Sequence, residues 1–139
     1  MKIVINTCFG GFSLSHEGVL AYAKRKGITL YPEKTEYGWW DYWIVPKEQR
    51  QTDVTGEQWH NMTFEERRSL KERYEQEHLS SREIPRDDPA LVAVVEELGK
   101  KANGICAELR VVEIPDDVDW CIEEYDGKEW VAEKHRTWV

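Results

Sequence analysis

The sequence has few cysteines, no excess of basic residues and no long apolar run. Its three cysteines, Cys8, Cys106 and Cys121, lie far apart and form no CxxC pair, which argues against a disulfide framework or a cysteine-based zinc site. Lys and Arg number 19 against 27 Asp and Glu, and the formal net charge of -8 argues against non-specific nucleic-acid binding. No apolar stretch approaches the roughly 20 residues of a membrane-spanning helix, and the first residues lack the pattern of a secretory signal. We therefore expect a soluble cytoplasmic protein with free thiols, no membrane partner and no direct nucleic-acid partner.

The sequence also lacks the common signatures of catalytic and cofactor sites. Neither GxxxxGK[ST] nor GxGxxG occurs, so no nucleotide-binding fingerprint applies. The four histidines, His16, His60, His78 and His135, have no HxH or HxxxH spacing, and we predict no metal and no cofactor. Cys8 precedes a predicted helix start, where a thiol can become nucleophilic, and only His16 or His135 would be a plausible base. We predict no catalytic residue, while a small cysteine-dependent enzyme stays open as an alternative.

What is present begins with a strand, a helix and a second strand. The β-branched run in "KIVIN" predicts a buried strand. Ser15 can cap the next helix, with Leu14 and Val19 as a hydrophobic staple, and Gly27 can end it in the left-handed conformation. "ITLYP" predicts a second strand stopped by Pro32, and we expect the two strands to form a parallel, right-handed β-α-β unit.

The middle of the chain is less regular. Residues 36–46, "EYGWWDYWIVP", predict a third extended segment, and residues 47–61 predict a polar loop or variable insertion. Thr63 and Glu66 form the capping-box pattern at the start of a charged helix, and residues 80–88 read as a polar linker. Asp88 and Pro89 predict the start of the most buried helix, which we expect Gly104 to end.

The last third predicts antiparallel strands. In "CAELRVVEIP", alternation places Ala107, Leu109 and Val111 on one face. Asp126-Gly127 is a strong turn signal for a hairpin, whose register would pair Ile122 with Val131, Cys121 with Ala132 and Glu124 with Glu129. The last pair opposes two like charges, which costs stability. We predict one α+β domain over residues 1–139, in the order β-α-β-β-α-α-β-β-β.

The glycine-containing stretch after the first strand is the leading candidate for a ligand site. Glycines between a strand and a helix allow a tight turn and a close approach to a ligand, and a helix N-terminus offers free N–H groups to an anion. A plain turn would need the same glycines without any ligand. We predict that an anionic group binds here, to Cys8, Gly10, Gly11, Phe12, Ser13, Ser15 and His16.

Aromatic residues are abundant, with seven tryptophans in 139 residues. Trp39, Trp40 and Trp43 crowd into "YGWWDYW", which could be a stacking platform, an interface or core. At the end of the sequence His135 and Arg136 form a basic cluster suited to phosphate or to ordinary counter-charges. We add Trp39, Trp40, Trp43, His135 and Arg136 to the predicted ligand-binding residues.

The stretches "KIVIN" followed by "CFGGFSLS", "DPALVAVVEELG" and "EYDG" followed by "EWVAE" and "HRTW" resemble a family of small uncharacterised proteins of tailed phages and prophages. The resemblance spans most of the chain and implies a phage gene acting in a bacterial host cell. It implies no chemistry, because no activity or catalytic residue is established for that family.

This setting leads to three hypotheses about function. The first is a non-enzymatic phage protein that sequesters a small anionic nucleotide-like ligand, such as an immune signal, to counter host defence. Enclosing such a ligand favours a homo-oligomer with pockets between subunits. The second is an inhibitor that binds a host defence protein through an acidic and aromatic surface. The third is the cysteine-dependent enzyme.

Overall fold

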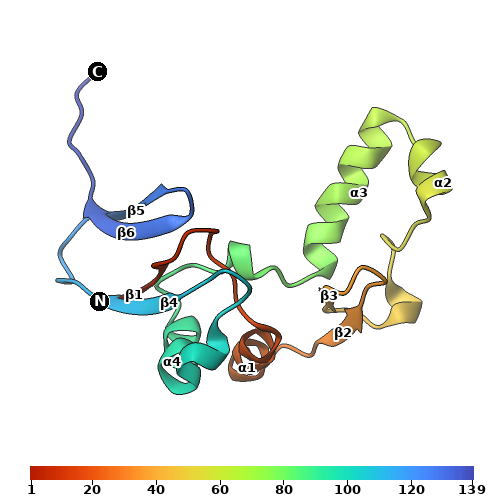
Figure 1. Ribbon diagram of the computed structural model, residues 1–139. Coiled ribbons are helices and arrows are strands. Elements are labelled where there is room, and N and C mark those ends of the chain that lie inside the picture. The colour runs from red at the N-terminus through yellow and green to blue at the C-terminus, as the bar shows by residue number, and fades with distance from the viewer. The chain divides into compact units, whose positions relative to one another are not determined.

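The computed structural model describes residues 1–139 and has an α+β fold (Figure 1). The predicted class, the order of the main helices and strands and the C-terminal antiparallel hairpin are confirmed. The chain divides into two compact units, the first formed by Met1–Gly27 with Ser81–Val139 and the second by Ile28–Ser80. No helix combines the length and the apolar character needed to cross a lipid bilayer.

The strands of the first unit pair in antiparallel fashion. β1 (Lys2–Asn6) pairs with β4 (Leu109–Glu113), in a register that sets Val4 opposite Val111. β5 (Trp120–Tyr125) and β6 (Lys128–Glu133) form the hairpin, and its three predicted residue pairs are all confirmed. Four consecutive residues of β1 are buried, as expected for a short run of β-branched side chains covered on both faces.

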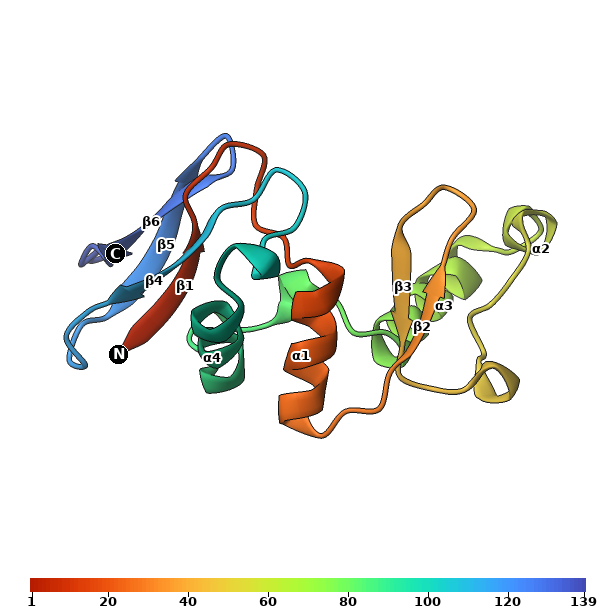
Figure 2. The same cartoon turned by 60° about the horizontal axis from the view of Figure 1, so that its bottom comes forward.

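Two helices form the other layer of this unit (Figure 2). α1 (His16–Lys26) begins at its predicted cap, where Ser15 Oγ accepts from the Gly18 N–H, and ends at Gly27 with φ 69°. α4 (Pro89–Leu98) begins at Asp88, as predicted. The core of the unit consists of apolar side chains from β1, α1 and α4 with those of Phe12, Leu14, Ile84 and Ala102.

The prediction of a parallel β-α-β unit is wrong. β1 pairs with β4, whereas the strand after α1, β2 (Tyr31–Lys34), pairs with β3 (Trp40–Trp43) in the second unit. A parallel strand must be covered on both faces, but every residue of β2 is exposed. Pro32 lies inside this strand instead of ending it, at an edge position where its missing N–H costs no ladder hydrogen bond.

The end of α4 also differs from the prediction. The helix stops at Gly99, whose φ is 56°, and a 3₁₀ turn then spans Gly99–Ala102. Gly104 does not have a positive φ. Glycine is needed at this position for close packing, because a Cβ on Gly104 would overlap the Ser13 side chain.

The second unit contains two further helices. α3 (Phe64–Glu77) begins with the predicted capping box, in which Thr63 and Glu66 bond each other's backbone N–H groups. The segment 47–61, predicted as a loop, holds a 3₁₀ turn, Lys47–Gln49, and the short helix α2 (Gly56–His60). Thr55 and Gln58 form a second capping box there, so the sequence held a helix signal that the loop prediction missed.

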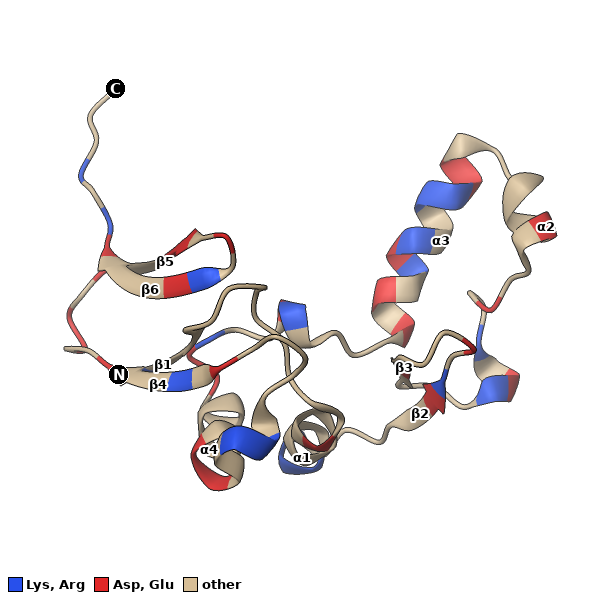
Figure 3. Cartoon of the chain, viewed as in Figure 1, with Lys and Arg blue, Asp and Glu red and all other residues tan.

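The two units differ in how much apolar surface they bury. Within Ile28–Ser80, Trp43 is the one buried apolar side chain, whereas Tyr37, Trp39 and Phe64 are more than half exposed. Figure 3 shows acidic and basic residues interspersed along α3, and only Glu77 of that helix is buried. This unit therefore offers much of its aromatic surface to other molecules.

The cap of α4 predicts a pH dependence of stability. Burial favours a higher pKa for Asp88, but hydrogen bonds from the Tyr22 hydroxyl and the Ala90 N–H, with the Lys26 ammonium 3.4 Å away, outweigh burial and lower the pKa. A lowered folded-state pKa contributes stability that is present above the unfolded pKa of about 3.9 and is lost as pH falls through the folded value. Asp88→Asn keeps an acceptor for the Ala90 N–H but removes the charge, and it should cost about 1 kcal/mol at pH 7.

Urea unfolding of both proteins between pH 7 and pH 2 measures this effect. The difference between wild type and Asp88→Asn should shrink below about pH 4. A difference that stayed constant down to pH 2 would show that the Asp88 charge does not contribute to stability.

Candidate functional site

The glycine turn after β1 contacts the tip of the β5–β6 hairpin. Gly10 and Gly11 have φ values of 116° and 98°, which side-chain-bearing residues rarely adopt. The Gly10 N–H donates to Asp126 O at 3.1 Å, and a Cβ on Gly127 would overlap the backbone nitrogens of Gly10 and Gly11. The close approach that these glycines permit is thus made by another part of the chain.

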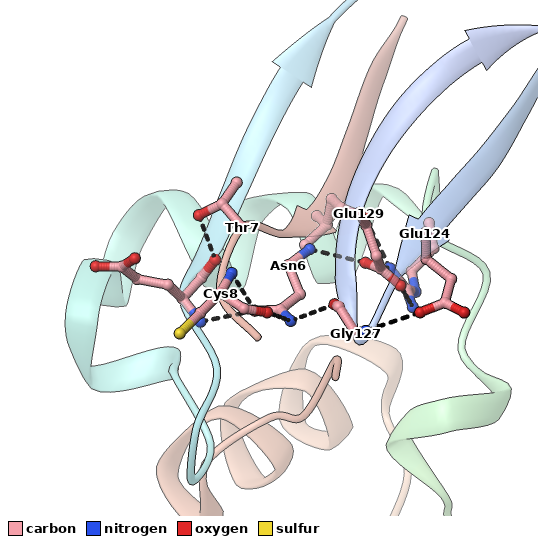
Figure 4. A network of polar contacts seen from close by, with 9 residues as sticks. Asn6, Thr7, Cys8, Glu124, Gly127 and Glu129 are labelled. Atoms are coloured by element: carbon pink, nitrogen blue, oxygen red, sulfur yellow. Dashed lines mark hydrogen bonds and ion pairs between the residues drawn. The ribbon is translucent and has the colours of Figure 1, made fainter. Parts of the chain in front are cut away.

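Asn6 joins the turn to the hairpin and to the segment before β4 (Figure 4). The Asn6 side chain is fully buried, and its Nδ2 donates to Cys8 O at 2.7 Å and to Gly127 O at 2.8 Å. Its Oδ1 accepts from the N–H groups of Cys8 and Glu108, at 3.3 and 2.8 Å. All the hydrogen-bonding capacity of this amide is therefore used inside the protein.

An ion pair lies next to this amide. Arg86 donates to both oxygens of Glu129, at 2.7 and 2.9 Å, and the Asn6 N–H donates to the same carboxylate at 2.8 Å. The Arg86 guanidinium also lies over the Phe12 ring, 3.7 Å from its centroid. Sequence reasoning missed this ion pair, because it placed Arg86 in a polar linker and gave Glu129 only the like-charged partner Glu124.

The same contacts explain the two like charges that face each other in the hairpin. Glu129 is neutralised by Arg86, while Glu124 Oε2 accepts from the Gly127 N–H at 2.8 Å. Each carboxylate therefore has its own partner, and the cross-strand repulsion between them is offset.

The serines of the predicted site bond to the chain around the 3₁₀ turn that follows α4. Ser13 Oγ donates to Ile105 O at 3.2 Å, and Ser15 Oγ donates to Lys101 O at 2.5 Å while capping α1. His16 is the first residue of α1, and the Cys8 thiol is partly exposed. The structure thus brings the predicted turn residues together and gives several of them a structural role, while their binding of a ligand stays a prediction.

The predicted basic partners of the turn lie at the other end of the hairpin. β6 runs from Lys128, beside the turn, to Glu133, a length of roughly 17 Å at the rise of a strand. His135 and Arg136 follow in an exposed segment without regular structure, which Figure 1 shows leading away from the hairpin. The structure therefore does not place Arg136 at the glycine turn.

The three predicted tryptophans belong to the second unit and differ in exposure. Trp43 is buried between the Arg50 guanidinium, 4.0 Å from its ring centroid, and the His78 ring at 3.8 Å. Trp39 is exposed and stacks on Tyr37 with ring centroids 5.1 Å apart. Trp40 begins β3 opposite Lys34. Trp43 is thus the core residue of this cluster.

A pocket that sequence reasoning missed lies in the second unit. Its volume is about 250 Å³ and its lining is mainly apolar, formed by Thr52, Val54, Trp59, Leu70, Lys71 and Tyr74. Arg67 holds the wall formed by α2, because its guanidinium donates to Trp59 O at 3.1 Å and to His60 O at 3.2 Å. The sequence signals for this pocket were the T-x-x-Q capping box before Trp59 and the i, i+4 spacing of Leu70 and Tyr74.

Two polar groups of this pocket have no partner within the protein. Lys71 is exposed and makes no ion pair. Thr52 is buried, and its hydroxyl has no hydrogen-bond partner. Burial, together with the negative charge of Asp41, raises the pKa of Tyr74, so this phenol stays neutral at physiological pH. The pocket therefore combines two aromatic rings, one cation, the unpaired Thr52 hydroxyl and the neutral Tyr74 phenol.

Comparisons with models of protein families, with curated proteins and with solved structures found no match. The structure contains no group of three or more His, Cys, Asp or Glu side chains that could hold a metal ion.

Proposed function

We propose that this protein is a non-enzymatic binding protein that captures a small, anionic, nucleotide-like ligand. The observation that carries the proposal is the pocket between α2, α3 and residues 52–54. Its volume of about 250 Å³ lies just below the range of roughly 300–1,000 Å³ typical of sites for drug-sized ligands, which suits one planar ring system. Trp59 and Tyr74 offer ring surface for a base, and Lys71 offers a charge for a phosphate or carboxylate.

The polar groups supply the orientation of the ligand. Stacking of a base on an aromatic ring contributes about 1–3 kcal/mol and tolerates any base, so it gives affinity without specificity. The Lys71 ammonium is the group that would favour an anionic ligand over a neutral one. The Thr52 hydroxyl would find a partner on a ligand edge after a rotation about its χ1 angle.

The biological setting in this proposal comes from the resemblance to small phage proteins. A phage protein that binds a nucleotide-derived signal without destroying it would counter a host defence by lowering the concentration of the free signal. Sequestration of this kind needs tight binding, which is easier when the ligand is enclosed, and this supports the predicted homo-oligomer.

Native mass spectrometry of the protein purified from phage-infected, defence-positive cells tests the proposal. A small anionic mass released on denaturation is the expected result, and its value identifies the ligand. A ligand-free protein from these cells would count against the proposal.

Substitutions in the pocket should lower the occupancy of this ligand. We expect Lys71→Ala to reduce it about tenfold, because it removes the unpaired cation, and Trp59→Ala to reduce it at least as much, because it removes a stacking surface. Lys24→Ala makes the same charge change in the last turn of α1 and should leave occupancy unchanged. Loss of ligand in Arg136→Ala and Trp40→Ala, with normal occupancy in Lys71→Ala, would instead favour the residues predicted from the sequence.

A second candidate function is the inhibition of a host protein. The observation in its favour is the exposed aromatic surface of Ile28–Ser80, including Tyr37, Trp39 and Phe64. A host protein that co-purifies from infected cells, and that dissociates from a variant with reversed charges on α3, would support this function over capture of a small ligand.

A further inference from the structure

We propose that the end of the first unit where three turns meet is a face through which two copies of this chain associate. The turns are the glycine turn at residues 8–11, the turn at residues 104–107 and the hairpin turn at Asp126-Gly127. Figure 2 shows these turns at the same end of the unit. The proposal is independent of the ligand proposed above.

Direct contacts fix the three turns relative to one another. The Gly10 N–H donates to Asp126 O at 3.1 Å, and a Cβ on Gly10 would lie 2.8 Å from the Cβ of Cys106. The Gly104 N–H donates to Ser13 O at 3.0 Å, just after the glycine turn. The side chains that these turns present therefore form one surface.

That surface carries three exposed apolar side chains. Phe9, Ile105 and Tyr125 are 55%, 92% and 71% exposed, one residue from each turn or from the strand end beside it. The Lys128 ammonium lies 5.9 Å from the centroid of the Phe9 ring. Tyr125 is the cross-strand partner of Lys128 in the hairpin. Cross-strand partners share one face of a hairpin, so Tyr125 extends the patch that begins at Phe9. We call Phe9, Ile105, Tyr125 and Lys128 the turn patch.

The backbone at the turn patch is strained. Cys106 has a φ of 62°, a conformation that L-residues other than Asn and Asp seldom adopt. Its side chain is exposed, as is that of Ile105, so the strained turn presents these two residues instead of burying them. Backbone strain of this kind is concentrated at functional positions.

The charges of the turn patch indicate which partner it fits. Lys128 makes no ion pair, and neither does the exposed Asp126, two residues before it. In the proposed dimer, a two-fold axis through the patch pairs Lys128 of one copy with Asp126 of the other, twice. A charged patch can pair with its own copy across a two-fold axis only when it carries both signs of charge, as Lys128 and Asp126 do here. The occupant is therefore a second copy of the chain.

Sedimentation velocity of the full-length chain at about 1–100 μM tests the proposal. Because few side chains take part, we expect a weak dimer with a dissociation constant in the micromolar range, as is typical of small interfaces. Ile105→Asp should weaken dimerisation more than tenfold, and the exposure of Ile105 means that its loss should not affect folding. Phe64→Asp, the same kind of change at an exposed aromatic residue on α3, should leave the dimer unchanged.

A double-mutant cycle isolates the proposed ion pair. Lys128→Met and Asp126→Asn should each weaken the dimer several-fold, and the double variant should be no weaker than either, because both remove one interaction. Asn is well tolerated before Gly in a tight hairpin turn, so Asp126→Asn should leave the hairpin intact. A wild-type chain that is monomeric at 100 μM would overturn the proposal, as would a dimer that survives Ile105→Asp or that is lost in Phe64→Asp.

Discussion

Arg86→Met should lower the free energy of unfolding by roughly 3 kcal/mol, one of the two largest effects that we expect in this protein. Arg86 is the sole cationic partner of Glu129, and the Arg86 and Glu129 side chains are only 18% and 10% exposed. Removing the guanidinium leaves the carboxylate with little access to water and with the Asn6 N–H as its remaining donor. The substitution also removes the contact with the Phe12 ring. Urea unfolding followed by tryptophan fluorescence measures the change.

Two controls separate the stranded charge from the loss of the arginine itself. Arg86→Met combined with Glu129→Gln should recover part of the loss, because the amide oxygen still accepts from the Asn6 N–H and no charge is left unpaired. Arg25→Met breaks an exposed ion pair with Glu97 and should cost less than about 1 kcal/mol. If the double variant is no more stable than Arg86→Met, the cost does not come from an unpaired Glu129.

The parts of the fold that sequence patterns predict correctly are those with local signals. The start of α3 follows from Thr63 and Glu66, which bond each other's backbone within one turn. The register of the β5–β6 hairpin follows from Asp126-Gly127, because a two-residue turn fixes every later pair. In both cases residues close in the sequence determine the geometry.

The parts that the sequence does not predict depend on distant partners. β1 and β4 pair although most of the chain separates them in sequence. Nothing within "KIVIN" indicates that β1 pairs with β4 and not with the nearer strand that follows α1. Arg86 lies in a stretch of polar residues, so its pairing with Glu129 becomes visible only when the hairpin lies beside β1. The repulsion between Glu124 and Glu129 in the hairpin is likewise offset only when Arg86 lies beside Glu129.

The candidate site shows the same division. The glycine turn forms where the sequence predicts a turn, but the contact at Gly10 and Gly11 is with Gly127, more than a hundred residues later. Of the clustered tryptophans, Trp43 belongs to the core. The pocket is lined instead by Trp59 and Tyr74, each of which lies in a polar segment with no Trp, Tyr or Phe next to it in the sequence. Aromatic density along the sequence therefore does not locate the pocket, since its walls come from α2 and α3 together.

The second large effect should come from Gly127→Ala, with an expected loss of about 3 kcal/mol or more. Gly127 has a φ of 88°, which alone makes a Cβ unfavourable by about 1 kcal/mol. The added Cβ would also overlap the backbone of Gly10 and Gly11, and backbone atoms move only with their whole segment. The hairpin would have to separate from the glycine turn, which breaks the bond from Asn6 Nδ2 to Gly127 O and the one from Gly10 N to Asp126 O.

Gly27→Ala is the matched control for this second prediction. Gly27 also has a positive φ, 69°, but nothing lies within 4 Å of the position of its Cβ, so only the backbone strain of about 1 kcal/mol should appear. Thermal and urea unfolding of the two variants should thus differ by about 2 kcal/mol or more. Hydrogen exchange should locate the damage, with faster exchange at the amides of Gly10 and Asn6 in Gly127→Ala alone. Equal losses of stability in the two variants would mean that Gly127 is needed only for the conformation of the hairpin turn. The backbone of Gly10 and Gly11 would then be free to contact a ligand.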